Sequence, residues 1–487
     1  VLCHIFKLFE KVLHDRLSKA IDNYLIPQQA GFRPGKSTTS QVINLTQLLE
    51  DGYENRKITG VAFIDLTAAY DTVNLRLLMK KLYAITRDFK FTSIIRSLLQ
   101  NRRFSVEFQG KQSRWRAQKN GLPQGSVLAP LLFNIYTNDQ PLPAGTENYI
   151  YADDRAMAVQ GDSFEEVEKR LTDALDALCQ YYADSQLKPN PSKTQVCAFH
   201  LRNKQANRKL RVSWKDTPLE HCANPKYLGV TLDRALTYKQ HCINTKMKVS
   251  GRNNILRKIT NSSWGAKPEV VRTTALTVCF SAGEYASSVW YNSAHAKQVD
   301  IALNETCRLV TGCLKPTPID KLYHLAGIAP PAVRREAAAY SERARAELSE
   351  SHLLHNIQPA TRRLKSRRSF LRATDNLSDQ PGSRVDRWKR SRERHWMEPK
   401  EELAPGHNED WTVWKSLNRL RTNTARSRDN LMKWGYSTVS NLCDCGDVQT
   451  TQHMYNCPEC PSHCTLEDLM LATPNAVDVA RFWAKCI

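Results

Sequence analysis

Apolar residues at helical spacing mark several segments in the first part of the chain. Residues 1–25 fit an amphipathic helix, and a second helix is expected from about residue 41 to 54. NLRLLMKKLY, residues 74–83, predicts a third helix, and Ser163 with Glu166 forms a capping box that opens a fourth. The apolar face of the first helix consists of Ile5, Leu8, Phe9, Val12, Leu13 and Leu17.

Short apolar runs between these segments predict strands. Val61–Leu66 is typical of a buried strand, and Asp65 is its first polar residue. Residues 149–159, YIYADDRAMAV, are apolar, then acidic, then apolar again, which predicts a hairpin whose turn carries two carboxylates. KTQVCAFHL, residues 193–201, returns as a strand. Strands thus alternate with helices up to about residue 235, which predicts an α+β fold.

The remaining half is organised differently. Residues from about 235 to 350 are mainly helical and basic in pattern, and residues 361–405 are dense in arginine with little apolar periodicity. We expect a first domain at 1–240, a helical domain at 241–350, a flexible basic linker at 351–405 that can lie on phosphate, and a Cys/His-rich module at 406–487.

Composition narrows the class of protein. The formal net charge is +21, and nucleic acid is the first partner expected for such an excess, because bound Lys and Arg release counterions from phosphates. A phospholipid surface, or a basic but otherwise ordinary surface, is the alternative. No stretch of 18 apolar residues occurs, so neither a membrane span nor a secretory signal is expected.

Cysteine usage favours a reducing compartment, the nucleus or the cytoplasm. The 14 cysteines are scattered singly and then clustered between Cys443 and Cys464, unlike a disulfide framework. The chain begins with Val rather than Met, which suggests a piece of a longer product.

Three aspartates have the context of a nucleotidyl-transfer site. Asp65 stands near the end of a predicted strand, and Asp153 and Asp154 stand on the predicted hairpin turn. Two Mg²⁺ ions about 3.5–4 Å apart can activate a 3′-hydroxyl and stabilise the leaving oxygen, and Mg²⁺ prefers such hard oxygen ligands. Taken singly, a helix cap explains Asp65 and an ordinary turn explains the aspartate pair.

The order of motifs around these aspartates resembles that of reverse transcriptases. FIDLTAAYDTV, GLPQGSVLAPLLFNIY and YADD resemble motifs A, B and C, PNPSKTQ resembles motif D, and YLGVTLD resembles motif E. QAGFRPGKST resembles the fingers motif of non-LTR retrotransposon enzymes. The match covers about residues 1–240. With LNRLRTNTARSRDNLMKWG and the terminal cluster, the chain resembles an N-terminally truncated fragment of a jockey-like LINE reverse transcriptase.

The resemblance implies a role for each matched residue in catalysis. Asp65 and Asp153 match the metal ligands, Asp154 matches the third carboxylate, and Lys193 matches the motif D lysine that protonates pyrophosphate. Tyr70 matches the aromatic gate that excludes a 2′-hydroxyl. As isolated residues, Lys193 would be read as solvated and Tyr70 as a core aromatic.

Further matched residues would bind substrates. Gln124 and Gly125 match the motif B turn near the templating base, and Arg33 and Lys36 stand where a fingers loop holds triphosphate. A primer grip is expected at Tyr227, Leu228 and Gly229. Without the resemblance, an ordinary turn explains the first pair and a buried strand explains the last three.

GFRPGKS is not a P-loop. The motif G-x-x-x-x-G-K-[ST] would need glycine where Ala30 stands.

Arg155 departs from the family pattern, which usually has an uncharged residue after the aspartate pair. A guanidinium beside the carboxylates would lower their pKa or compete with Mg²⁺. Strand alternation would instead point it away, toward primer phosphate.

The last cluster, CDCGDVQTTQHMYNCPEC, predicts a zinc site. Cys443, Cys445, His453 and Cys457 form a CCHC set suited to tetrahedral Zn²⁺, although the C-x-C spacing is tighter than usual. Cys460, His463 and Cys464 could substitute, and reduced structural cysteines are the alternative. The nearby Trp411, Trp414 and Trp434 would stack bases or pack in a core.

These patterns predict a right-hand polymerase, with palm and fingers carrying an antiparallel sheet, a helical thumb, and a Cys/His-rich module at the end. The resemblance implies an RNA-directed DNA polymerase that uses two Mg²⁺ ions, with Zn²⁺ at the terminal cluster. RNA template, DNA primer or target, and dNTPs would be its partners, and an endonuclease would lie upstream. A decayed copy that only binds nucleic acid, and an RNA-directed RNA polymerase, are the alternatives.

Overall fold

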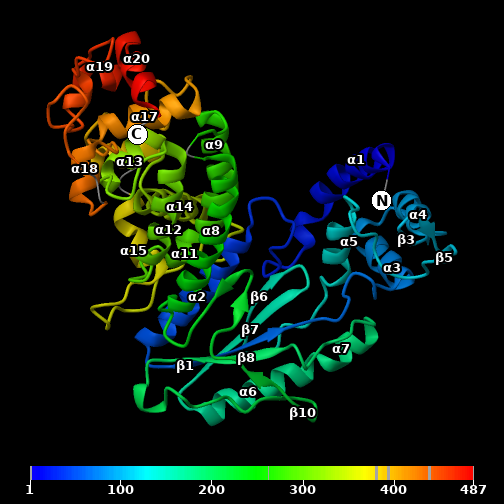
Figure 1. Ribbon diagram of the computed structural model, residues 1–487. Helices are drawn as coiled ribbons and strands as arrows, with labels where there is room; N and C mark the ends of the chain where they lie inside the picture. The colour runs from blue at the N-terminus through cyan, green and yellow to red at the C-terminus, as the bar shows by residue number, and fades with distance from the viewer. Residues whose placement is uncertain (1–2, 262, 379–381, 392–394, 437–439, 486–487) are drawn as a thin grey trace. The chain divides into compact units, whose positions relative to one another are not determined.

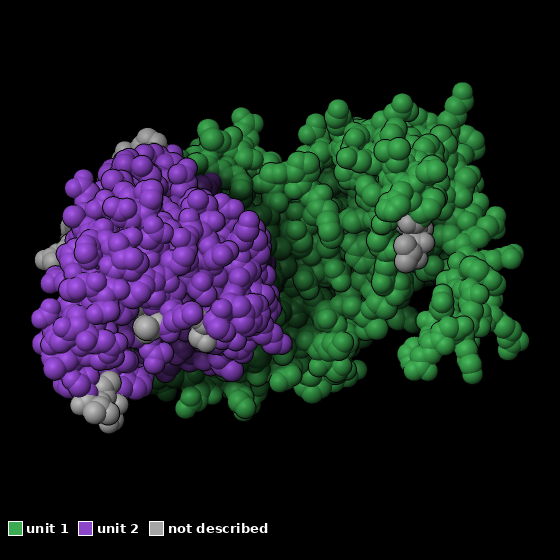
Figure 2. Space-filling view, turned by 45° about the horizontal axis from the view of Figure 1, so that its top comes forward, with its two compact units in different colours: residues 1–237, 342–375 green, residues 238–341, 376–487 purple. Residues whose placement is uncertain are grey.

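The computed structural model of this chain describes residues 3–261, 263–378, 382–391, 395–436 and 440–485 (Figure 1). The chain divides into two compact units, coloured separately in Figure 2. The first comprises residues 1–237 and 342–375, and the second comprises residues 238–341 and 376–487.

The first unit is built on a five-stranded, mostly antiparallel sheet. The strand order is β11 (Glu220–His221), β8 (Gln195–Phe199), β1 (Ile58–Ile64), β7 (Asp154–Gly161) and β6 (Glu147–Tyr151). β1 pairs antiparallel with both β7 and β8, and only the β11–β8 pair is parallel. The strand and hairpin predicted from the apolar runs are therefore confirmed.

Helices cover both faces of this sheet. A side-chain carbon on Gly60 would meet Val167 and Leu171 of α6, whereas one on Gly52 of α2 would meet Thr59. Because neighbouring strand residues point to opposite faces, α6 and α2 lie on opposite sides of β1. The helices of this unit are α1 (His4–Ile21), α2 (Thr38–Glu54), α3 (Leu75–Thr86), α4 (Phe89–Leu99), α5 (Ala129–Tyr136), α6 (Phe164–Ala177) and α7 (Cys179–Asp184), with 3-10 turns η1 (Asp22–Tyr24) and η2 (Asn203–Gln205).

Capping explains where two of these helices begin. Ser163 accepts the amide hydrogen of Glu166 at the start of α6, which is one half of the predicted capping box; the Glu166 carboxylate accepts the Asp162 amide instead of the Ser163 amide. Ser37 caps α2 through the Ser40 amide.

The first helix is buried on only part of its predicted apolar face. Leu13 and Leu17 enter the core of the first unit. Ile5, Leu8, Phe9 and Val12, from the same predicted face, are exposed.

Four small strand pairs complete the first unit. They are β2 (Arg103–Phe104) with β5 (Arg116–Ala117), β3 (Glu107–Phe108) with β4 (Lys111–Gln112), β9 (Ser213–Trp214) with β10 (Thr217–Pro218), and β12 (Lys226–Tyr227) with β13 (Val230–Thr231).

The basic stretch expected to be a flexible linker is partly packed. Residues 361–368, TRRLKSRR, lie along the end of α2, and we call them the basic strap. Arg367 forms an ion pair with Glu50 at 2.6 Å, and the amides of Arg363 and Leu364 donate to Glu54. Carboxylates on α2 therefore hold this segment, and the first unit includes residues 342–375, unlike the boundaries expected from the sequence.

The second unit is helical. Its helices are α8 (Lys239–Ile259), α9 (Pro268–Thr274), the π-helix η3 (Ala275–Phe280), α10 (Ser281–Gly283), α11 (Ser287–Trp290), α12 (Lys297–Thr311), α13 (Ile319–Ala326), α16 (Arg384–Arg390), α17 (Trp411–Arg421), α18 (Arg428–Lys433), η4 (His453–Tyr455), α19 (Leu466–Leu471) and α20 (Pro474–Trp483). The unit boundaries fall inside α14 (Pro331–Leu348) and α15 (Phe370–Ser378). Trp411 and Trp414 are buried, so they pack in the core, whereas Trp434 is half-buried. None of the helices in the described part of the chain has the length and apolar character that crossing a membrane requires.

Candidate active site

Strand register places Asp65 and Asp154 on the same face of the sheet. Ile64 pairs with Arg155, so the next positions along the two antiparallel strands, Asp65 and Asp154, face each other as the ladder ends. Both line a pocket of about 280 Å³. The hairpin turn between β6 and β7 also carries Asp153, which is near enough to Asp65 for that charge to raise its pKa.

Desolvation and mutual repulsion make ionisation of these carboxylates less favourable. Partial desolvation, followed by the charges of Asp153 and Asp65, raises the pKa of Asp154 to about 6. The pKa of Asp153 is raised by desolvation and by Asp65. A bound cation would relieve this repulsion, and carboxylate oxygens are the ligands that Mg²⁺ prefers, so the three residues fit a divalent-metal site.

Arg155 borders the same pocket, but its guanidinium does not pair with the carboxylates. It occupies the alternate face of β7 and is 3% exposed, with its guanidinium donating to Asn148, Gln140 and the Pro141 carbonyl at 2.7–3.0 Å. The expectation that strand alternation points Arg155 away from the carboxylates is confirmed, but the guanidinium is bound by Asn148, Gln140 and the Pro141 carbonyl rather than left free for primer phosphate. The guanidinium instead anchors the base of the hairpin.

A glutamine from the fingers motif holds the turn that carries Asp153. The Gln29 amide donates to the Ala152 carbonyl at 3.2 Å and accepts the Ala152 amide at 2.9 Å. Gly31 packs so closely there that a side-chain carbon would come within 2.3 Å of the Ala152 nitrogen, which only glycine tolerates. The sequence analysis missed Gln29, although its place in the fingers motif was a usable signal.

The loop carrying Lys193 is tied to Asp65. Asn190 donates its amide to the Asp65 carbonyl at 2.9 Å, and the Asp65 amide donates to the Thr194 hydroxyl at 3.2 Å. Lys193 consequently lines the same pocket as Asp65 and Asp154.

The predicted primer-grip residues line this pocket as well. Tyr227 ends β12, and Leu228 and Gly229, both with positive φ, form the two-residue turn to β13. The Tyr227 ring lies 5.7 Å from that of Phe63, and its hydroxyl donates to the Tyr149 carbonyl at 3.1 Å. Lys226, which the sequence analysis missed although it precedes the Tyr-Leu-Gly run, is a second lysine in the lining.

Tyr70 and the motif B turn are linked to each other. The Leu122 amide donates to the Tyr70 carbonyl at 2.9 Å, and the Tyr70 ring stacks on Phe133 at 4.5 Å. Burial, and then the charge of Asp153, raises the pKa of Tyr70. Gln124 is exposed, and Gly125 has φ +82°, a conformation that favours glycine.

Arg33 is not available to a triphosphate in this structure. It is 8% exposed, pairs with Asp22 at 2.9 Å, and donates to the carbonyls of Ile26, Gln29 and Asp22. The expectation that it binds substrate is therefore corrected, since it closes the loop. Lys36 donates to the Pro27 carbonyl at 2.8 Å, and burial, followed by the charge of Arg33, lowers its pKa to about 8.

The Cys/His cluster of the second unit has the geometry of a tetrahedral metal site. The ligand atoms of Cys443, Cys445, His453 and Cys457 all lie within 4.8 Å of one another. Cys443 and Cys457 Sγ are 3.6 Å apart, and Cys445 Sγ lies 3.3 Å from His453 Nε2. A tetrahedron with Zn–S bonds of about 2.3 Å has edges of about 3.8 Å, so these four residues fit zinc.

The alternative zinc ligands, Cys460, His463 and Cys464, lie outside the group of four. Cys460 and Cys464 are buried in the core that α17, α19 and α20 share with the cluster, and His463 lies 3.2 Å from the Cys457 carbonyl. Among the described residues the predicted CCHC set is the only group of three or more ligand atoms within 4.8 Å of one another; the carboxylate oxygens of Asp65, Asp153 and Asp154 do not all lie that close together in this structure. Burial opposes ionisation of Cys443, but hydrogen bonds from the Cys445 amide and from Gln449 and His453 lower its pKa to about 6.

Comparison with known proteins defines the class of the first unit. Residues 1–232 match the family model for reverse transcriptase (RNA-dependent DNA polymerase). These residues are therefore similar to reverse transcriptases, and the α+β class predicted from the sequence is confirmed by the sheet and helices of the first unit.

The relatives narrow the class further. The chain is 28% identical over 385 residues to the probable RNA-directed DNA polymerase from transposon BS of Drosophila melanogaster, covering 75% of this chain and 42% of that protein. It is 28% identical over 322 residues to the RNA-directed DNA polymerase from mobile element jockey of the same fly, covering 63% of this chain and 34% of that protein. The chain is thus similar to polymerases of mobile elements, jockey among them, as the motifs indicated.

The chain spans less than half the length of these curated relatives. Among solved structures, apo telomerase from Candida tropicalis aligns with 62% of this chain and 49% of that chain, at 10% identity and a TM-score of 0.35.

Proposed function

We propose that this chain catalyses template-directed addition of dNTPs to a DNA 3′-end, copying RNA. The observation that carries the proposal is that one pocket gathers Asp65, Asp154, Lys193 and the turn at Tyr227–Gly229 from four separate loops and strand ends. The reverse-transcriptase match over residues 1–232 supports it.

In this proposal Asp65, Asp153 and Asp154 hold two Mg²⁺ ions. When bound, the metal would lower the pKa of the primer 3′-hydroxyl and neutralise charge on the α-phosphate. The raised pKa of Asp154 fits such a role, because a site that disfavours its own negative charge gains most from a divalent cation.

The remaining residues position substrates in the proposed reaction. Lys193 stands beside the carboxylates and would protonate the pyrophosphate as it leaves. Tyr70, held against Phe133, would block a 2′-hydroxyl, and the exposed Gln124–Gly125 turn would contact the template base pair. Tyr227, Leu228 and Gly229 would support the primer end, and Lys36 would meet the triphosphate.

We further propose that Cys443, Cys445, His453 and Cys457 hold one zinc ion. The ligand distances favour this assignment over reduced structural cysteines, which have no reason to gather within 4.8 Å. The zinc would stabilise the end of the second unit rather than take part in nucleotidyl transfer.

Primer extension tests the polymerase proposal. Wild type and Asp153→Ala are compared on a poly(rA)/oligo(dT) hybrid with Mg²⁺ and either dTTP or rUTP. Extension with dTTP that is lost in Asp153→Ala supports the proposal. Equal use of rUTP would favour an RNA polymerase, and folded wild-type protein that binds the hybrid without extending it would mean a decayed copy.

A further inference from the structure

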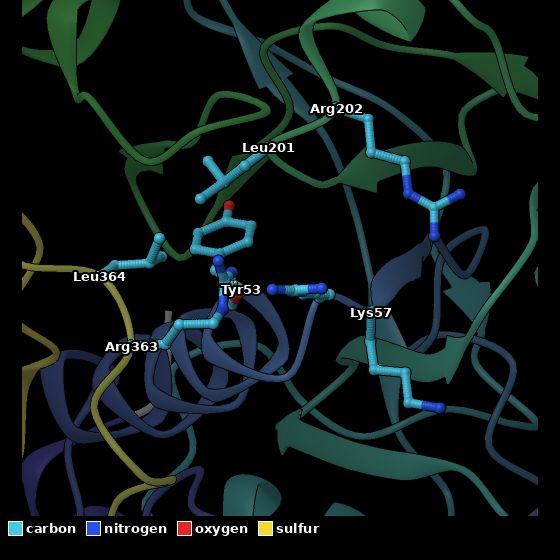
Figure 3. Close-up of a pocket in the computed structure, with 7 residues that line it drawn as sticks. Tyr53, Lys57, Leu201, Arg202, Arg363 and Leu364 are labelled. Atoms are coloured by element: carbon cyan, nitrogen blue, oxygen red, sulfur yellow. Dashed lines mark hydrogen bonds between the residues drawn. The ribbon is translucent and has the colours of Figure 1, made fainter.

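A second pocket of the first unit opens at the opposite end of β1 from Asp65. It has a volume of about 410 Å³ (Figure 3). Its lining comes from the end of α2, from the residues after β8, and from the basic strap: Tyr53, Arg56, Lys57, Leu201, Arg202, Arg363 and Leu364. Seven residues of β1, at about 3.3 Å each, separate the start of that strand from Asp65, so the two pockets lie on the order of 20 Å apart.

Backbone carbonyls, rather than carboxylates, orient two of the arginines in this pocket. Arg363 donates to the carbonyls of Glu54 and Tyr53 at 3.0 and 2.8 Å, and Arg202 donates to the Asp162 carbonyl at 2.7 Å. A carbonyl fixes the guanidinium without cancelling its charge. These side chains are therefore positioned for an anion while their charge is retained.

The pocket keeps an excess of positive charge. Four cations line it, and two carboxylates contact the lining: Asp162 pairs with Lys57 at 2.7 Å, and Glu54 accepts the amides of Arg363 and Leu364. Four minus two leaves two charges uncompensated. Arg56 is exposed, and no partner for its side chain is found among the described residues.

An apolar wall stands beside these cations. In Figure 3, Leu201 and Leu364 flank Tyr53, while Arg202 and Lys57 lie on the other side of the pocket. Tyr53 is 2% exposed, and its hydroxyl donates to the Arg234 carbonyl at 2.8 Å. It therefore supports the apolar wall, but its ring is too buried to stack on a base. The pocket thus offers an apolar wall with Arg363 beside it and further cations on the opposite side, which suits a nucleobase and its phosphate.

The cations continue beyond the pocket along the basic strap. Arg367 anchors the strap to Glu50, while Arg362, Lys365 and Arg368 are exposed. If no polyanion binds along it, a row of cations on a segment that is fixed in place only adds electrostatic repulsion within the protein. This row favours a nucleic-acid strand over a single free nucleotide.

We propose that this pocket and the basic strap bind a single-stranded nucleic acid away from the polymerase site. One nucleotide enters the pocket, its phosphate contacts Arg56, Arg202 and Arg363, and its base rests against Leu201 and Leu364. The strap contacts the phosphates that follow. The proposal rests on the proposed function only in taking nucleic acid as the partner of this chain.

Charge reversal at Arg56 tests the site, with Lys169→Glu as the matched control. Arg56 and Lys169 are both exposed, with no partner found for either side chain among the described residues, and Lys169 lies on α6, away from the pocket lining. Binding of fluorescein-labelled 15-mers, oligo(rU) and oligo(dT), is measured by anisotropy without added Mg²⁺ or dNTPs over a range of salt. We expect Arg56→Glu to weaken binding of at least one 15-mer about tenfold and to reduce the magnitude of its salt slope by about 1. Lys169→Glu should bind as wild type does.

Photocrosslinking locates the contact directly. An oligo(rU) 15-mer carrying 4-thiouridine should crosslink to peptides that contain Tyr53–Lys57 or Leu201–Arg202, and Arg56→Glu should lose those crosslinks. Equal binding by the two reversal variants, or crosslinks absent from both peptides, would overturn the proposal. Competition by UMP as strong as by the 15-mer would show a free-nucleotide site instead.

These measurements are independent of catalysis. Because binding is measured without Mg²⁺, Asp153→Ala should bind the 15-mers as wild type does even if no protein extends a primer. If wild-type protein does not extend a primer but Arg56→Glu still weakens binding of the 15-mers, only the polymerase proposal is refuted.

Discussion

The two candidate metal sites of this chain are built in opposite ways. Asp65 and Asp154 stand 89 positions apart and meet because β1 and β7 share a register. The four ligands of the Cys/His cluster fall within 15 consecutive residues, and their distances, not a sheet, define the site. We therefore expect the sheet around the aspartates to stay folded when one aspartate is replaced. The segment around the Cys/His cluster should lose its fold when one of its four ligands is replaced.

The largest effect on catalysis is expected from Asp65→Asn. Losing one carboxylate removes several kcal/mol of transition-state stabilisation, so primer extension should fall at least about 10³-fold. Circular dichroism and Tm should stay near wild type, because the sheet forms without the charge. A clear loss of fold would show that the two sites differ less than proposed.

Cys445→Ser should instead lose both metal and structure. A zinc-finger site contributes about 10–16 kcal/mol through four ligands, so removing one should weaken zinc binding on the order of 10²-fold or more. Zinc content by mass spectrometry should drop by one per chain, and residues 440–485 should become sensitive to protease. Cys460→Ala is the control, since this buried cysteine lies outside the four ligands and its variant should keep the metal.

Gln29→Ala should reduce catalysis through positioning alone. Without the two hydrogen bonds to Ala152, the turn carrying Asp153 is less fixed, and kcat should fall about 10- to 100-fold, the range for residues that orient metal ligands. KM for dTTP should change little. Gln28→Ala is the matched control, because no hydrogen-bond partner is found for its side-chain oxygen in the described structure, and an equal drop in kcat there would refute the role given to Gln29.

The smallest effect is expected from pH. The folded-state pKa of Asp154, about 6, lies above the usual aspartate pKa of 3.8, so between these two pH values the folded state binds a proton that the unfolded state does not. This group therefore favours folding as pH falls from 6 toward 4 and opposes it above 6, while Mg²⁺ binding weakens below about pH 6. The free energy of unfolding is measured with urea at pH 5 and pH 7.5. The difference between the two pH values should be smaller in Asp154→Asn than in wild type, and an equal difference would contradict the assigned pKa.

Local patterns predicted much of the first unit correctly. The hairpin at Tyr149–Val159, the strand ending before Asp65 and the helix capped by Ser163 all follow from apolar spacing and capping, which act over a few residues. The CCHC set was predictable for the same reason, because its ligands are close in sequence.

Long-range contacts explain what the patterns missed. Arg33 carries a charge that suggested substrate, but carbonyls from its own loop bind it. The basic strap lacks periodicity, yet Glu50 and Glu54, more than 300 residues earlier, hold it in place. Sequence spacing does not reveal such distant partners. For the same reason the exposure of Ile5, Leu8, Phe9 and Val12 on the first helix was not predicted, because apolar periodicity does not show what covers a helix face.

Two neighbouring residues provide the most direct test of the register argument. Asp154 and Arg155 are adjacent in sequence, but strand alternation sends one to the carboxylate pocket and the other into the base of the hairpin. Primer extension is measured for Asp154→Asn and Arg155→Met below the Tm of both proteins. The account predicts at least about a 10³-fold loss for the first and near wild-type kcat with a lowered Tm for the second. Activity retained in Asp154→Asn, or lost in folded Arg155→Met, would contradict it.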